Sequence, residues 1–264
     1  MVHVNGLDLE LVEQGSGIPV VFSHGGASDL RYWEPQRAVF AERYRFVAYS
    51  HRFHGQGPWS ADADGSAEAD AADLVELIRS LGAGPVHLVG FSSAIALRAA
   101  LREPTVLRSL TIIEPNVPWL LEGDEEGGAI LAAWRLANER VRDEAAADPV
   151  RRAELWFELV NNRGRGTFDA QPEAFRAMWL ENFGVVRPHA SPPEPLTCER
   201  LATITVPALV LGAEHGMPYS RAILDRLAAC LGAEAVIVPG VSHFMSYQAP
   251  DVFNPLLLDF LASR

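Results

Sequence analysis

Leu88-Val89-Gly90-Phe91-Ser92-Ser93-Ala94-Ile95-Ala96 is a short apolar run that leads through Gly90 and Ser92 into a helical pattern. A buried strand that passes directly into a helix at a serine predicts a nucleophile elbow, a strained turn that holds the serine hydroxyl above the sheet. Gly90 supplies the small residue that this close approach of strand and helix needs, and Ala94 stands where a second glycine is usual. We therefore expect Ser92 to be a nucleophile. The alternative is a serine that only caps the helix beginning near Ser93.

On both sides of this segment, short apolar runs alternate with longer helical patterns, which predicts a parallel sheet covered by helices on both faces. The predicted strands are Val20–Ser23, Phe46–Tyr49, Val86–Val89, Ser109–Glu114, Ala208–Leu211 and Ala235–Val238. The predicted helices are Ala67–Leu81, Ser93–Arg102, Ser220–Leu231 and Pro250–Ala262. The segment Val2–Val12 contains Asn5-Gly6, which is typical of a hairpin turn.

Composition limits the class of protein. The chain has 264 residues, of which 48% are hydrophobic and 21% charged, so we expect one globular domain with an insertion. A net charge of -12 argues against nonspecific nucleic-acid binding, because a phosphate backbone is held mainly by Lys and Arg. The spacing of Cys198 and Cys230 matches neither a zinc pattern nor a disulfide framework, and no segment approaches the roughly 20 apolar residues of a membrane span. These features predict a cytoplasmic protein in a reducing compartment, with no membrane partner.

The alternation of strands and helices stops between residues 116 and 203, where helical patterns rich in Trp, Leu, Ala and Arg take over. We interpret this stretch as a helical insertion. Trp119, Trp134 and Trp179 are candidate lining residues of a substrate pocket there. The alternative for each of them is simple packing of the insertion onto the sheet domain, since large aromatic side chains are usually core.

Two further fragments fit acyl-transfer chemistry. Ser23-His24-Gly25-Gly26 follows an early predicted strand, and a backbone N–H in such a loop can stabilise a developing oxyanion. Gly26 is the candidate donor, together with the N–H of Ser93. His243 follows the last predicted strand in Pro239-Gly240-Val241-Ser242-His243. Its imidazole can accept the serine proton and return it to the leaving group.

In their order along the chain, these fragments resemble the α/β-hydrolase superfamily over essentially the whole sequence. The segments that match are Ser23–Gly26, Tyr49–Gly57, Gly90–Ser93, Ile113–Pro115 and Pro239–His243. The resemblance implies an α/β fold with a mainly parallel eight-stranded sheet and helices on both faces. It also implies a core domain made of residues 1–115 and 204–264, a helical lid made of residues 116–203, and chemistry that needs no cofactor and no metal.

The acid that orients His243 departs from the commonest family pattern, because Gly216 stands near the expected aspartate after the strand Ala208–Leu211. Two carboxylates remain. Glu114 ends the strand after the elbow helix, as the acid does in some relatives, and Glu214 lies close to Gly216 in sequence. We favour Glu114, and the alternative for it is a carboxylate that caps the start of the insertion.

His51 and His54 lie three residues apart after the second predicted strand. No carboxylate or cysteine completes a metal site with them, so we interpret this segment as a structural loop.

Together these residues predict a serine hydrolase that cleaves an ester or lactone of a small, uncharged, hydrophobic substrate. Rivals on the same fold are a C–C bond hydrolase, a lyase or a cofactor-free oxygenase, and a rival of another class is a binding protein that has lost catalysis. The sequence leaves the oligomeric state open, a homo-oligomer included.

Overall fold

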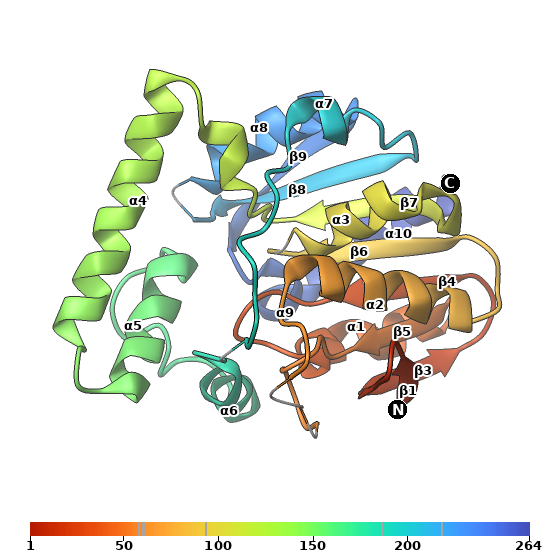
Figure 1. Ribbon diagram of the computed structural model, residues 1–264, viewed down its shortest axis with the longest axis horizontal. Helices are drawn as coiled ribbons and strands as arrows, with labels where there is room; N and C mark the ends of the chain where they lie inside the picture. The colour runs from red at the N-terminus through yellow and green to blue at the C-terminus, as the bar shows by residue number, and fades with distance from the viewer. Residues whose placement is uncertain (58, 60–61, 93, 186, 218) are drawn as a thin grey trace.

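The computed structural model describes residues 1–57, 59, 62–92, 94–185, 187–217 and 219–264. A central sheet is covered by helices on both faces, and a group of helices extends beyond one end of it (Figure 1). The predicted α/β architecture, a sheet with helices on both faces, is thus confirmed.

The main sheet has seven strands in the order β3-β5-β4-β6-β7-β8-β9. Their bounds are β3 Leu11–Gly15, β4 Pro19–Ser23, β5 Arg45–Tyr49, β6 Val86–Phe91, β7 Leu107–Ile113, β8 Ala208–His215 and β9 Glu234–Ser242. Among the described strands of this sheet, β3 pairs antiparallel with β5, and the other neighbours pair in parallel. The sheet therefore has one strand fewer than the eight that the resemblance implied. Near the N-terminus, β1 (Val2–Val4) and β2 (Leu7–Leu9) pair with each other as a separate hairpin, because the chain turns back at Asn5 and Gly6 with positive φ.

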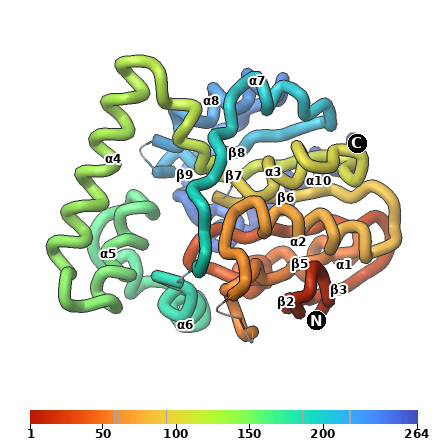
Figure 2. The backbone as a smooth tube through the Cα atoms, viewed as in Figure 1, coloured from red at the N-terminus to blue at the C-terminus, as the bar shows by residue number. Residues whose placement is uncertain are grey.

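The central strands are apolar along their whole length because helices cover both of their faces. Every residue of β4 and of β6 is buried. The helices of the sheet domain are α1 Glu34–Ala41, α2 Ala67–Ser80, α3 Ile95–Arg102, α8 Ser220–Leu231, α9 Met245–Gln248 and α10 Pro250–Ala262. Helices α2 and α3 pack side by side on one face, and α1 packs against α10 on the other (Figures 1 and 2).

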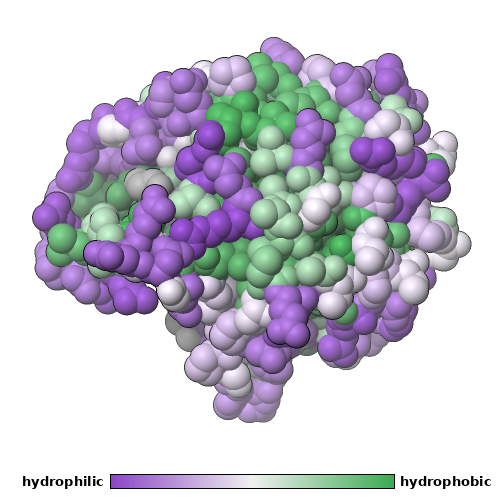
Figure 3. All heavy atoms as spheres, turned by 90° about the horizontal axis from the view of Figure 1, so that it is seen from above, coloured by the Kyte–Doolittle hydropathy of each residue, from purple (hydrophilic) through white to green (hydrophobic). Residues whose placement is uncertain are grey.

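Between β7 and β8, the described residues form helices and no strand. The helices are η3 Pro118–Leu121, α4 Glu125–Glu144, α5 Pro149–Asn161, α6 Glu173–Asn182 and α7 Cys198–Leu201. Carboxylates cap two of them: Asp124 accepts a hydrogen bond from Gly127 N, and Asp148 accepts one from Arg151 N. Helix α4 buries only two of its residues, and hydrophilic side chains cover most of that part of the surface (left side of Figure 3).

Cys198 and Cys230 form a disulfide that joins α7 to the end of α8. The interpretation that the spacing of the two cysteines indicates no disulfide was therefore wrong. They lie 32 positions apart with no framework around them, and only the packing of α7 on α8 brings their Cα atoms to 5.0 Å. The reducing compartment was predicted from the spacing of these cysteines. Because disulfides are rare in cytosolic proteins, the bond removes the support for that prediction. None of the described helices is long and apolar enough to cross a membrane.

Candidate active site

Ser92 lies at the turn between β6 and α3, with φ of 44°, a conformation that non-glycine residues adopt only under strain. Its N–H donates to Ile113 O at 2.9 Å, which holds the turn against the neighbouring strand. A Cβ at Gly90 would lie 2.5 Å from Ala96 Cβ, so only glycine allows this approach of strand and helix. Since α3 begins at Ile95 with Ala94 before it, Ser92 sits in a strained elbow and not in a helix cap.

Glu114 follows the end of β7 and is also held at positive φ, 49°. Its side chain is buried, and both carboxylate oxygens are occupied. Oε1 accepts from Ala213 N at 2.7 Å, and Oε2 accepts from Met217 N at 3.3 Å and lies 2.9 Å from His243 Nδ1. The structure thus pairs His243 with Glu114, the carboxylate that the sequence favours.

Glu214, the other candidate acid, lies on the far side of the strand end. Its side chain is 53% exposed, and Oε2 accepts a hydrogen bond from Gly240 N at 2.7 Å. A carboxylate in that position points away from the imidazole.

His243 directly follows β9 and is buried between two phenylalanines, with ring centroids 5.0 Å from Phe91 and 4.8 Å from Phe244. A carboxylate can only accept, so Nδ1–H donates to Glu114 and the lone pair of a neutral ring lies at Nε2. Among the described residues, Nε2 and the Ser92 hydroxyl share no hydrogen bond. Such contacts are often long in unliganded enzymes and tighten when substrate binds.

The loop after β4 brings Gly26 to the same region. Gly26 lines the cavity above Ser92, and a Cβ there would meet nothing within 4 Å. The other predicted oxyanion donor, Ser93, lies outside the described residues.

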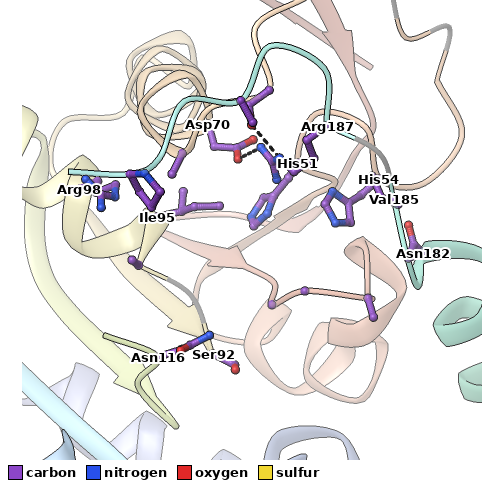
Figure 4. A pocket seen from close by; sticks show the side chains of 18 of the residues that line it. His51, His54, Asp70, Ser92, Ile95, Arg98, Asn116, Asn182, Val185 and Arg187 are labelled. Atoms are coloured by element: carbon purple, nitrogen blue, oxygen red, sulfur yellow. Dashed lines mark hydrogen bonds and ion pairs between the residues drawn. The ribbon is translucent and has the colours of Figure 1, made fainter. Parts of the chain in front are cut away.

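Ser92 opens into a cavity of about 550 Å³ (Figure 4). Its apolar wall comes from the loop after β4, the first residue of α3, the start of the insertion and the segment after α6: Ala27, Ile95, Pro118, Trp119 and Val185. Its polar wall is formed by residues that the sequence interpretation did not assign to a site: His51, His54, Asp70, Arg98, Asn182 and Arg187. Only the spacing of His51 and His54 stood out in the sequence, and it was assigned to a structural loop.

The arginines of this wall already have acidic partners. Arg98 forms an ion pair with Glu68, and Arg187 forms one with Asp70. Burial raises the pKa of Asp70 to about 7, while the Arg187 guanidinium opposes that rise. Asn182 joins the insertion to the core, since it donates to Asp29 at 2.8 Å and accepts from Gly55 N at 3.0 Å.

The three tryptophans proposed from the sequence occupy different environments. Trp119 lines the cavity, with the Arg98 guanidinium 5.5 Å from its ring centroid. Trp134 packs edge-on against Tyr219 at 4.7 Å, and Trp179 is buried, with Nε1 donating to Ala153 O at 2.9 Å. Trp134 and Trp179 are not among the described residues that line this cavity.

Among the described residues, no group of three or more His, Cys, Asp or Glu side chains has the arrangement of a metal site. His51 and His54 have ring centroids 5.9 Å apart and nearly perpendicular planes.

Comparisons with known proteins show the family to which the chain belongs. A family model described as alpha/beta hydrolase matches residues 20–256. The chain is 26% identical over 270 residues to "Putative carbamate hydrolase RutD" of Agrobacterium fabrum, covering 92% of both chains. It is 24% identical to 2-(acetamidomethylene)succinate hydrolase of Mesorhizobium japonicum, covering 98% of this chain and 94% of the relative.

Solved structures share the fold at lower identity. Est816, described as an N-acyl homoserine lactone degrading enzyme, has a TM-score of 0.76 at 23% identity, with 98% of this chain and 99% of that chain covered. The carboxylesterase CesB of Bacillus subtilis has a TM-score of 0.76 at 20% identity, with 100% of this chain and 90% of that chain covered.

Proposed function

Because this chain belongs to the alpha/beta hydrolase family, we propose that it is a serine hydrolase that needs no cofactor and cleaves an ester or lactone through an acyl-enzyme. The observation that carries the proposal is the 2.9 Å contact between His243 Nδ1 and Glu114, together with Ser92 on a strained turn whose N–H donates to Ile113 O, the residue before Glu114. A buried carboxylate in this position holds the imidazole in one tautomer and stabilises the imidazolium that forms during turnover.

In the proposed reaction, Ser92 Oγ attacks the substrate carbonyl carbon while its proton passes to His243 Nε2. The carbonyl oxygen becomes an oxyanion, for which Gly26 N–H and Ser93 N–H are the proposed donors. The tetrahedral intermediate expels the alcohol, which takes the proton from His243. Water, deprotonated by the same ring, then attacks the acyl-enzyme and releases the acid and Ser92.

Residues 116–203 would act as a lid. Trp119, Asn182 and Arg187 belong to this stretch and line the cavity. Ser92, Glu114 and His243 belong to the sheet domain and not to residues 116–203. We expect the insertion to select substrates and the sheet domain to carry the chemistry.

The size and charge of the cavity support a small, uncharged substrate. A volume of about 550 Å³ falls within the usual range of small-molecule sites. Arg98 and Arg187 are each paired with a carboxylate of the protein, so neither is free to attract an anion. The apolar wall near Ile95 and Trp119 suits a hydrophobic acyl group.

A second candidate is cleavage of a carbamate or amide by the same residues. Two relatives are named as hydrolases of a carbamate and of an acetamido compound. The serine mechanism is common to both bond types, and they differ in the leaving group that His243 must protonate.

Fluorophosphonate labelling combined with a substrate screen tests this function. We expect the probe to label Ser92, and we expect Ser92→Ala to lose both labelling and turnover of p-nitrophenyl esters, lactones or carbamates while keeping its circular dichroism spectrum. Ser16→Ala, at an exposed position, is the matched control and should behave like the wild type. Wild-type turnover by Ser92→Ala would refute the mechanism, and an unlabelled, inactive wild type would favour a binding protein.

A further inference from the structure

We propose that His54 is a specificity-determining residue, whose Nε2 accepts a hydrogen bond from an uncharged N–H or O–H group of the substrate. This inference rests on the proposed function, because it concerns the cavity into which Ser92 opens. It adds a chemical requirement that cavity size and an apolar wall do not impose.

His54 is buried except toward the cavity. Its residue is 5% exposed, and it lines the same cavity as Ser92. In Figure 4 the ring lies in the wall of the cavity across from Ser92. A substrate acylating Ser92 would therefore extend toward this ring.

The hydrogen bonds of the ring determine which nitrogen carries the proton. His54 Nδ1 lies 3.1 Å from Arg52 O, and a carbonyl oxygen can only accept. Nδ1 is thus the donor, and a neutral ring has its lone pair at Nε2. Nε2 has no hydrogen-bond partner among the described residues. Some polar side-chain atoms are both unpaired and fully buried, but Nε2 is not one of them.

The surroundings keep the ring uncharged at neutral pH. Burial is the main cause that lowers the pKa of His54 to about 4; the nearby Arg187 guanidinium acts in the same direction, while the hydrogen bond to Arg52 O and the charge of Asp29 oppose the shift. The rings of His24 and His51 lie 5.2 and 5.9 Å away, and burial also lowers their pKa values, that of His24 to about 3. Since the folded-state pKa is depressed, the lone pair is available at every pH well above about 4.

The loop that carries His54 is held on several sides. His51 N donates to His24 Nε2 at 2.9 Å, His54 N donates to His51 O at 3.1 Å, and Gly55 N donates to Asn182 at 3.0 Å. Phe53 adopts a positive φ of 67° between these contacts. A ring fixed in this way is preorganised for a partner, which lowers the entropic cost of binding.

An acceptor with fixed direction selects by repulsion as well as by attraction. An ester or ether oxygen facing Nε2 would place two lone pairs against each other, whereas an amide N–H or a hydroxyl would form a hydrogen bond. A protonated amine would find no free carboxylate, because Asp70, the one acidic side chain among the described residues that line the cavity, is paired with Arg187. The remaining class is an uncharged substrate with a donor group.

Isosteric substrates test this selection. We would compare p-nitrophenyl esters of acyl chains ending in an acetamido group with those ending in an acetoxy group, over a short series of chain lengths. The two differ only by N–H against O. For the chain length that reaches His54, we expect kcat/KM to favour the acetamido substrate by about ten- to hundredfold.

Two substitutions of His54 distinguish the effect of its hydrogen-bond acceptor from the effect of the side chain's shape. In His54→Asn, the amide can replace Nδ1–H toward Arg52 O but offers nothing in place of Nε2, so the preference should fall close to one. His54→Gln places an amide oxygen near the Nε2 position and should restore part of the preference for the acetamido substrate. His3→Asn, at an exposed histidine, should keep the wild-type ratio. An unchanged ratio in His54→Asn would overturn the proposal.

A measurement without turnover separates this inference from the proposed function. In ¹⁵N-histidine NMR of Ser92→Ala, the Nε2 resonance of His54, assigned by its loss in His54→Asn, should shift on adding the acetamido compound and stay in place with the acetoxy compound. No shift with either compound would overturn the role of His54 even in an active hydrolase. A shift in a protein that hydrolyses nothing would retain the binding site and reject the hydrolase.

Discussion

A Cβ at Gly216 would lie 2.5 Å from Glu114 Oε2 and 2.6 Å from Oε1. The glycine therefore provides the space that the carboxylate occupies. An aspartate is common near this position in the superfamily, whereas here the carboxylate that contacts His243 comes from the end of the neighbouring strand, β7. The position of the Glu114 carboxylate therefore depends on the glycine, because any side chain at position 216 would exclude it.

Gly216→Ala should reduce turnover without unfolding the protein. The new methyl group must displace the Glu114 carboxylate from Ala213 N and His243 Nδ1, the contacts that fix the imidazole. We expect kcat to fall about a hundredfold or more, since losing the orienting acid of a serine protease triad costs about 10⁴-fold.

Gly128→Ala is the control for that substitution. Gly128 lies in α4, where a Cβ would meet nothing within 4 Å. Alanine is favoured over glycine inside a helix by roughly 1 kcal/mol, so stability should rise slightly and activity should not change. Equal kcat values for Gly216→Ala and Gly128→Ala would contradict the coupling of Gly216 to the acid.

Glu114→Gln and Glu214→Gln should differ widely in kcat. The neutral amide introduced by Glu114→Gln cannot accept from both Ala213 N and His243 Nδ1 as the carboxylate does, and it cannot stabilise an imidazolium. We expect a loss of about 10⁴-fold for Glu114→Gln, by analogy with the serine protease triad, and near-normal turnover for Glu214→Gln. Steady-state kinetics on one ester decides the matter, and the reverse pattern would refute the assignment of the acid.

Trp119→Ala should change the ranking of substrates, whereas Trp179→Ala should chiefly lower stability. Trp119 lines the cavity, while Trp179 is fully buried against Phe157, Phe175 and Phe244. Removing a buried tryptophan side chain costs about 3–5 kcal/mol, measurable by urea unfolding. A fixed ranking in Trp119→Ala across an acyl-chain series would contradict its place in the substrate pocket.

Removing the disulfide should lower the free energy of unfolding by about 3–4 kcal/mol, the range for a closed loop of this size. The test is urea unfolding of the double variant Cys198→Ser, Cys230→Ser, compared with oxidised and reduced wild type. Reduced wild type should match the double variant. Two thiols that react in the denatured, unreduced protein would contradict the disulfide between α7 and α8.

Local pattern was sufficient for most elements of the sheet domain and for the elbow, although α1 and the edge strand β3 were not predicted. The helices Ser220–Leu231 and Pro250–Ala262 have the predicted bounds, because their apolar periodicity and flanking residues are encoded within the segments themselves. Ser92 was recognisable for the same reason: the apolar strand, Gly90 and the following helical pattern are contiguous. The order of Ser92, Glu114 and His243 along the chain likewise needs no coordinates.

Tertiary structure decided what depends on residues distant in sequence. Glu114 and His243 are 129 positions apart, so the sequence could favour Glu114 over Glu214 only by analogy with relatives. The contact itself forms because parallel strands end at one edge of the sheet. The disulfide, the separate environments of the three tryptophans and the cavity-facing nitrogen of His54 depend in the same way on packing between elements. A sequence pattern specifies which face of an element is buried, but the partners on that face are set by how the elements pack together.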